Sequence, residues 1–177
     1  MRGTRGVGHP PVVVVTGVPG AGKTTLANAV AAELDALLLS LDAIKERMFA
    51  GGQAGPDRDA LRRRAEAELA ASVDAATGPV VVDIWVAPHR DTERVCRLLK
   101  PYANRVAELL CRVPADVAVE RYRRRERGGP HLPADEATLQ RVREAVDEIA
   151  PLSLGVCIEV DTSAPVELGT ILDQLRL

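Results

Sequence analysis

Four residues near the N-terminus have the types and the spacing of a phosphate-binding loop. Gly17, Gly22, Lys23 and Thr24 fit the pattern G-x-x-x-x-G-K-[ST]. Glycines allow a tight turn whose N–H groups face phosphate oxygens, and the lysine would contact the β- and γ-phosphates of a nucleotide. The threonine hydroxyl would bind Mg²⁺. The pattern therefore predicts that the chain binds a nucleoside triphosphate, taken to be ATP, together with magnesium.

The context of this loop supports the prediction. A run of four valines, expected to be a buried strand, precedes the loop, and an amphipathic segment follows it. The alternative is an ordinary glycine-rich turn between a strand and a helix. Eight residues are expected to contact the nucleotide: Gly17, Pro19, Gly20, Ala21, Gly22, Lys23, Thr24 and Thr25.

Two carboxylates follow predicted strands and are expected at the same edge of a parallel sheet. Asp42 would orient an acceptor hydroxyl and take its proton, although it could also cap the helix that it begins. Asp83 ends the run VVVD and would support Mg²⁺ or bind substrate. Its alternative is a strand-end aspartate bonded to a loop.

Three further side chains are predicted to line the acceptor site. Lys45 follows Asp42 by one helical turn, on the same side of the helix. Trp85 and His89 come directly after Asp83 and would border the same rim. Their alternatives are a surface lysine and a core tryptophan. Asp42 and Asp83 complete the predicted substrate-binding set.

The segment ERYRRRERGGPHLP predicts an arginine-rich lid over residues 120–135. Guanidinium groups on such a segment can neutralise charge that develops during phosphoryl transfer and can exclude water. Arg121, Arg124 and Arg125 are expected to bind the nucleotide, and Arg121 and Arg125 to act in catalysis. The alternative is a solvated helix. A second basic run, Arg62 to Arg64, alternates with glutamates and predicts surface charge; His131 has no predicted partner.

Short hydrophobic runs alternate with longer amphipathic stretches, which predicts βα units and a parallel sheet. Residues 1–10 are expected to be a flexible leader, and residues 11–177 one three-layer α/β domain of P-loop kinase type. The expected strands are 12–16, 36–40, 80–84, 105–113 and 156–160. The expected helices are 23–34, 42–49, 57–76, 88–103, 115–127, 135–149 and 165–175, with a loop at 50–56.

The composition of the chain argues against several classes of function. The chain has 177 residues, 23 Lys and Arg against 25 Asp and Glu, and 46% hydrophobic residues. A net charge of −2 argues against general nucleic-acid binding, and no run reaches the length of a membrane span. Three separated cysteines predict neither a disulfide framework nor a zinc site, so a cytoplasmic protein is expected. The three lysines leave no N-K-x-D motif for reading guanine.

The segments GVPGAGKTTLA, LLLSLDAIKERMF, GPVVVDIW, ERYRRRER and VDTSAP, in this order, resemble the small P-loop kinases grouped with AAA-domain kinases. Chloramphenicol phosphotransferase-like, zeta-toxin-like and gluconate-kinase-like proteins belong to this group. The resemblance implies an acceptor-binding aspartate at Asp42 and a substrate or metal role for Asp83. It also implies that the loop carrying Ser163 borders the adenine of ATP.

The expected function is transfer of the γ-phosphoryl group of ATP, with Mg²⁺, to a hydroxyl of a small molecule. Alternatives are an NTP-binding regulatory module, a slow ATPase without a dedicated acceptor and, more weakly, a polynucleotide 5′-hydroxyl kinase. Few aromatic residues and the balanced charge argue against the last. The protein is expected to be a monomer or a homodimer.

Overall fold

The computed structural model describes residues 10–53, 57–125 and 129–175. The leader expected at 1–10 lies almost wholly outside the described residues. A five-stranded parallel sheet forms the centre, with strand order β2-β3-β1-β4-β5. The central strand β1 (Val12–Gly17) has all six residues buried, as expected for a strand that helices cover on both faces.

The remaining elements follow in a βα order. The other strands are β2 (Leu37–Ser40), β3 (Val80–Asp83), β4 (Val106–Arg112) and β5 (Val156–Asp161). The helices are α1 (Lys23–Glu33), α2 (Leu41–Ala50), α3 (Arg58–Ala75), α4 (Thr92–Leu99), the 3₁₀ helix η1 (Lys100–Arg105), α5 (Ala115–Arg124), α6 (Glu136–Glu148) and α7 (Leu168–Leu175). The predicted fold class and the order of its strands along the chain are confirmed.

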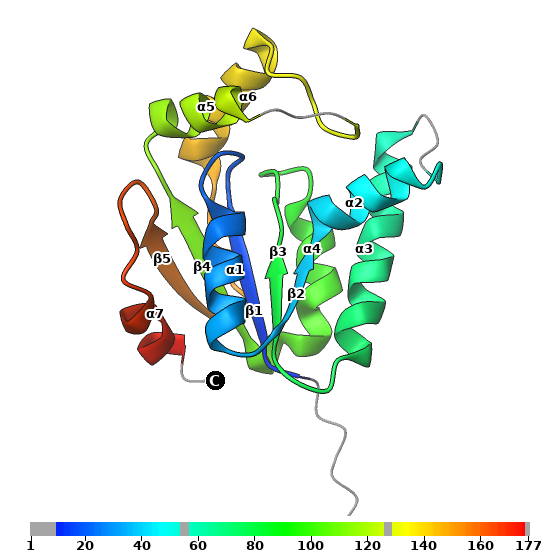
Figure 1. Ribbon diagram of the computed structural model, residues 1–177, viewed down its shortest axis with the longest axis vertical. Helices are drawn as coiled ribbons and strands as arrows, with labels where there is room; N and C mark the ends of the chain where they lie inside the picture. The colour runs from blue at the N-terminus through cyan, green and yellow to red at the C-terminus, as the bar shows by residue number, and fades with distance from the viewer. Residues whose placement is uncertain (1–9, 54–56, 126–128, 176–177) are drawn as a thin grey trace, which may run out of the picture.

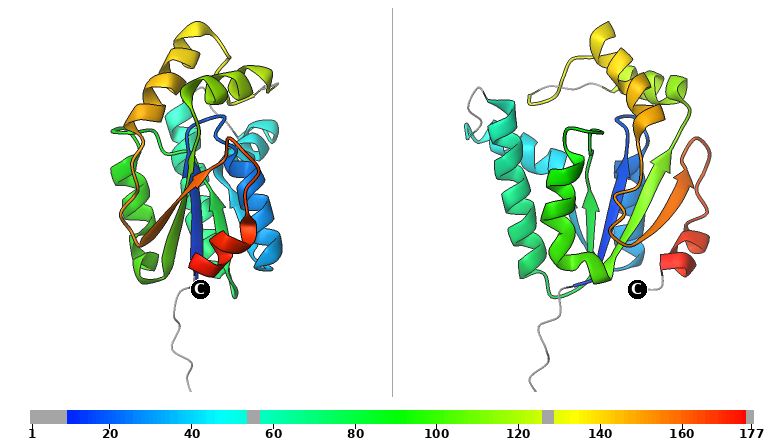
Figure 2. Two further views of the ribbon diagram at one scale, coloured as in Figure 1. Left: turned by 90° about the vertical axis from the view of Figure 1, so that its left-hand side faces the viewer. Right: turned by 180° about the vertical axis from the view of Figure 1, so that it is seen from behind.

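Helices cover both faces of the sheet, so the domain has three layers. Helices α1 and α7 pack on one face, and α3 and α4 pack on the other (Figure 2). Side chains of β1 alternate between two hydrophobic clusters: Val13 and Val15 pack in one, and Val12 and Val14 in the other. Helices α5 and α6 lie beyond the carboxyl ends of the strands (Figure 1). No described helix has the length and apolar character that crossing a bilayer requires.

The prediction of a continuous helix over 88–103 is wrong. Residues 84–91 form an irregular connection in which His89 has a φ of 59°, a conformation that a helix cannot contain. The buried Asp91 then accepts a hydrogen bond from the Ala87 N–H at 3.2 Å, which closes the turn before α4. Helix α4 ends at Leu99, and Pro101 follows in η1, where it cannot supply an α-helical N–H donor.

A buried carboxyl connects the inner part of the sheet to the chain that leads into β5. Glu108 of β4 accepts hydrogen bonds from the Thr16 hydroxyl at 2.6 Å and from the Leu152 N–H at 2.7 Å. Burial is the largest influence on its pKa and raises it above its ordinary value of 4.5, although both hydrogen bonds act in the opposite direction. The folded protein therefore binds a proton at Glu108 more readily than the unfolded chain does.

This raised pKa predicts a component of stability that is present below about pH 4.5 and is lost as the pH rises through the folded pKa of Glu108. In Glu108→Gln, the amide can donate to the Thr16 hydroxyl and accept from Leu152, so the component is removed with little change in packing. The free energy of unfolding of this variant relative to wild type is expected to increase between pH 4.5 and 7.5, measured by urea denaturation. The exposed change Glu33→Gln is the control. A pH-independent difference would show that Glu108 does not titrate in this range.

Candidate active site

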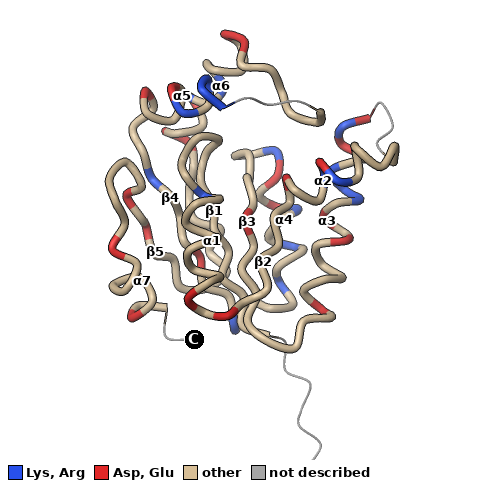
Figure 3. Tube along the Cα trace, viewed as in Figure 1, with Lys and Arg blue, Asp and Glu red and all other residues tan. Residues whose placement is uncertain are grey.

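A cavity of about 700 Å³ lies at the carboxyl edge of the sheet. The phosphate loop forms its floor, α2 and the first turns of α3 form one wall, and α5 and α6 form the opposite wall. Figure 3 shows basic residues on both walls. The space between α2 and α3, next to the residues predicted to bind the acceptor, is thus part of a wider cavity that extends to α6.

The phosphate loop has the backbone that its glycines allow. Gly20 and Gly22 have φ values of 87° and 81°, in the region that favours glycine. A Cβ atom on Gly20 would lie 2.2 Å from the carbonyl oxygen of Ala118 in α5, so a side chain there would displace α5. Of the loop residues predicted to contact nucleotide, six line the cavity: Pro19, Gly20, Gly22, Lys23, Thr24 and Thr25. Gly17 and Ala21 are buried within the loop and do not line it.

Lys23 also lines the cavity. Its ammonium group donates a hydrogen bond to the carbonyl oxygen of Val18 at 2.9 Å, within the loop itself. The same group lies 6.0 Å from the centre of the Trp85 ring, at the outer limit of a cation–π contact. Trp85 is therefore at the cavity, where it was predicted, and contacts the phosphate-loop lysine.

Asp83 joins the ends of two strands to the phosphate loop. Its Oδ2 accepts a hydrogen bond from the Thr24 hydroxyl at 2.8 Å and another from the Ser40 hydroxyl at 3.3 Å. The side chain is buried, and it lines the cavity with Thr24. A hydroxyl and a carboxylate in contact provide the hard oxygen ligands that Mg²⁺ prefers beside nucleotide phosphates. The two residues predicted as metal ligands are thus brought together.

Asp42 and Lys45 of α2 form an ion pair whose charged atoms are 2.6 Å apart. Burial alone would raise the pKa of Asp42, but the charge and hydrogen bond of Lys45 and the charges of His131 and Lys23 outweigh it, and the pKa lies below its ordinary value of 3.8. Asp42 is consequently ionised at neutral pH. The helix is capped by Ser40, whose hydroxyl accepts from the Ala43 N–H, so Asp42 is not the cap.

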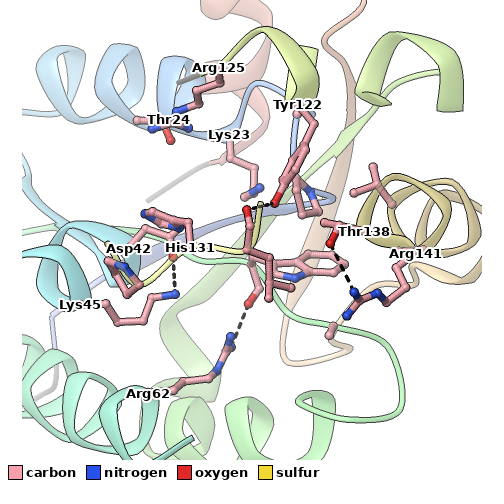
Figure 4. Close-up of a pocket in the computed structure, with 18 of the residues that line it drawn as sticks. Lys23, Thr24, Asp42, Lys45, Arg62, Tyr122, Arg125, His131, Thr138 and Arg141 are labelled. Atoms are coloured by element: carbon pink, nitrogen blue, oxygen red, sulfur yellow. Dashed lines mark hydrogen bonds and ion pairs between the residues drawn. The ribbon is translucent and has the colours of Figure 1, made fainter. Parts of the chain in front are cut away.

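The two arginines predicted to be catalytic line the cavity from α5 and its end. Arg121 donates to the carbonyl oxygen of Thr162 at 3.0 Å, and Thr162 in turn donates to the carbonyl of Ala21 at 2.6 Å. Arg125 projects from the end of α5 toward the phosphate loop (Figure 4). Arg124 instead pairs with Glu120 and lies outside the cavity lining. Residues 126–128 of the predicted lid are outside the described residues.

Two other predicted site residues are not brought to the cavity. His89 is exposed on the connection before α4 and is absent from the lining. Ser163 is exposed, and both its N–H and its hydroxyl donate to Asp161, at 2.8 and 2.6 Å. This local turn occupies the hydroxyl that was expected near adenine.

The prediction that Arg62 is a surface charge is wrong. Its side chain is buried and pairs with Glu66 at 2.8 Å and with Asp91 at 3.3 Å. It also donates to the carbonyl oxygen of Trp85 at 2.9 Å and lines the cavity (Figure 4). The spacing of Arg62 and Glu66 on one helix is equally typical of an exposed pair, and Asp91 is far away in the sequence. The reason for its burial is therefore a tertiary contact.

Several cavity residues were not predicted from the sequence. Figure 4 shows His131 beside Asp42 and Lys45, with Thr138 and Arg141 on the other side of the cavity. Arg141 donates to the Thr138 hydroxyl at 3.2 Å, and Tyr122 lines the space between them and the phosphate loop. Helix α6 has no motif, so only its position in the fold identifies it as a wall of the site.

Comparison with known proteins agrees with this geometry. The model of the AAA domain family matches residues 12–149. A solved structure of a candidate kinase from Chloroflexus aurantiacus J-10-fl is 28% identical, with a TM-score of 0.75 and coverage of 95% of this chain and 97% of that chain. Two more distant structures share the fold. A gluconokinase from Sinorhizobium meliloti 1021 is 21% identical, with a TM-score of 0.59 and coverage of 94% and 90%.

The second is a shikimate kinase from Acinetobacter baumannii in complex with shikimate, which is 18% identical, with a TM-score of 0.65 and coverage of 98% and 97%. The family model spans most of the chain, from the phosphate-loop strand to the end of α6. The resemblance derived from the sequence motifs is confirmed: the chain belongs to the AAA domain family and has the fold of the P-loop kinases.

Proposed function

We propose that the protein is an ATP- and Mg²⁺-dependent phosphotransferase that moves the γ-phosphoryl group to a hydroxyl of a small molecule. One observation carries the proposal: the ionised Asp42 lines the same cavity as Lys23 and Thr24 of the phosphate loop. A carboxylate in this position can bind an acceptor hydroxyl next to bound phosphates. The similar solved structures include a gluconokinase and a shikimate kinase, which supports a small-molecule acceptor.

The proposed nucleotide site uses the start of α1. N–H groups of the phosphate loop and the positive end of the α1 dipole would bind the phosphates, with Lys23 moving from the Val18 carbonyl to the β- and γ-oxygens. Thr24 and Asp83 would hold Mg²⁺. When bound, the ion neutralises charge on the β- and γ-phosphate oxygens.

Transfer then requires an aligned acceptor. The acceptor oxygen forms a bond to the γ-phosphorus as the bond from that phosphorus to the β–γ bridging oxygen breaks, and ADP leaves with the bond electrons. The acceptor proton passes to the Asp42 carboxylate. Because the transition state of phosphoryl transfer is loose, orientation of the hydroxyl matters more than strong basicity, which agrees with the lowered pKa of Asp42. Arg121 and Arg125 would stabilise the charge on the transferred group.

Replacement of Asp42 by asparagine tests the proposed base. Asp42→Asn is expected to reduce transfer by about 10² to 10⁴-fold while ATP binding is retained, because the amide cannot take the proton. The assay uses ATP labelled at the γ-phosphate with Mg²⁺ and a pool of hydroxyl metabolites, including antibiotics, sugars, sugar acids and nucleosides, with products resolved by mass. Asp147→Asn, an exposed change on α6 outside the cavity, is the matched control.

The products of this assay separate the alternatives. A labelled small molecule that disappears in Asp42→Asn supports the kinase and names its acceptor. Label released only as free phosphate, equally in both variants, would contradict the proposal and favour a slow ATPase. Label on an added oligonucleotide would favour a polynucleotide kinase.

The lowered pKa of Asp42 predicts the pH dependence of the reaction. A carboxyl group with a lowered pKa stays ionised until the pH falls below the ordinary pKa of that group. Asp42 should therefore cause no loss of kcat/KM between pH 8 and about pH 5. In Lys45→Gln the charge that does most to lower the pKa of Asp42 is removed, so burial raises this pKa. The acidic limb of the pH–rate profile should therefore move to higher pH. A pH–rate profile measures the limb. An unmoved limb would exclude Asp42 as the titrating group.

The arginines of α5 give a matched pair of variants. Arg125 lines the cavity, whereas Arg123 pairs with Glu120 and does not line it. Arg125→Ala is expected to lower kcat by about 10²-fold with little change in the affinity for ATP, because the guanidinium acts on charge that develops in the transition state. Arg123→Ala should keep the wild-type kcat. Equal rates for the two variants would contradict a catalytic role for Arg125.

A further inference from the structure

Residues 129–132, which precede α6, lie close to α2 (Figure 1), and His131 contacts Glu46 across 85 residues of sequence. His131 Nε2 lies 2.6 Å from Glu46 Oε1, and the Phe49 ring lies against Gly129, where an added Cβ would be 3.2 Å from Cδ1. On the other side, the Tyr122 hydroxyl donates to the carbonyl oxygen of Leu132 at 3.0 Å. Residues 129–132, here called the bridge, are therefore held by both α5 and α2.

The imidazole of His131 is mostly buried, although the residues that it contacts on α2 are exposed. The His131 side chain is 12% exposed, whereas its partner Glu46 is 51% exposed and Phe49 is 47% exposed. A surface ion pair with Glu46 would form equally well with a lysine or an arginine at position 131. The burial indicates that the ring is packed between the bridge and α2, with one nitrogen on Glu46 and one side at the cavity.

Charged groups lie near this ring on α2 and elsewhere around the cavity. Helix α2 carries Asp42, Lys45 and Glu46, of which Glu46 contacts the imidazole, and Lys23 and Arg125 line the same cavity as His131. Lys45 is paired with Asp42, so Glu46 is the carboxylate left for the imidazole. A protonated ring forms an ion pair with Glu46, whereas a neutral ring keeps one hydrogen bond.

We infer that His131 is a positioning residue that docks the bridge on α2 through Glu46, so that the cavity is closed over the acceptor side as well as the nucleotide side. The inference rests on the proposed function only in naming α2 as the acceptor helix. Docking holds α2, and with it Asp42, against the wall that carries Arg121 and Arg125.

The only tryptophan of the chain, Trp85, lines the cavity and reports its closure without any substrate. Acrylamide quenching of its fluorescence is expected to rise about twofold in His131→Ala and in Glu46→Gln at pH 6, because an undocked bridge admits the quencher. The double variant should be no more accessible than either single one, as expected for two groups that act as a pair. Urea denaturation confirms that each variant is folded.

A pair of variants distinguishes docking from a loss of packing. His131→Gln keeps an amide that can bond to Glu46, so it should restore part of the protection, whereas His131→Leu fills similar space without a polar group and should not. His89→Gln, an exposed change outside the cavity, should keep the wild-type response.

Quenching in His131→Ala and Glu46→Gln equal to that of the wild type would overturn the inference, as would equal protection in His131→Leu and His131→Gln. Because the measurement needs neither acceptor nor turnover, a failure of the phosphotransferase assay leaves its result intact. Conversely, wild-type quenching in these variants would not affect the Asp42→Asn test.

Discussion

The register of three parallel strands fixes the chemistry of the site. Asp83 at the end of β3 is aligned with Val15 of β1 on one side and with Ser40 of β2 on the other. This alignment places one carboxylate within hydrogen-bonding distance of Thr24 in the phosphate loop and of the residue that caps α2. A shift of β3 by one residue would turn Asp83 to the other face of the sheet. The nucleotide side and the acceptor side of the cavity are thus connected through Asp83.

Buried charge supports the wall of the cavity opposite α5 and α6. Arg62, Glu66, Asp91 and Arg94 form a network in which Glu66 contacts two guanidinium groups, and Asp91 contacts the same two together with that of Arg90. Removing one partner from such a network leaves an uncompensated buried charge, which destabilises a protein far more than loss of a surface pair does. The network connects α3 to the start of α4 and, through the Trp85 carbonyl, to the end of β3. It therefore holds the backbone around Trp85 next to the cavity.

The sequence was sufficient for features that depend on local spacing. The glycines and lysine of the phosphate loop, the hydrophobic run that ends at Asp83 and the alternation of strands and helices all follow from short-range chemistry and the βα architecture. The start of α4 did not follow, because Asp91 and the left-handed backbone of His89 override the helical pattern. Arg62 and His131 were missed since their partners lie 29 and 85 residues away along the chain. The local turn in which Ser163 bonds to Asp161 was not predicted, and the role of Ser163 beside adenine stays a prediction.

Two sets of contacts hold helix α5 against the phosphate loop. The carbonyl of Ala118 lies against Gly20. Arg121 donates a hydrogen bond to the Thr162 carbonyl, and the Thr162 hydroxyl donates one to the carbonyl of Ala21. Tyr122, on the same helix, donates a hydrogen bond to the carbonyl oxygen of Leu132. Moving α5 away from the phosphate loop would therefore separate Ala118 from Gly20 and break the hydrogen bond of Arg121 to Thr162. A residue other than glycine at position 20 would thus disturb, through α5, contacts as distant from the phosphate loop as the one between Tyr122 and Leu132.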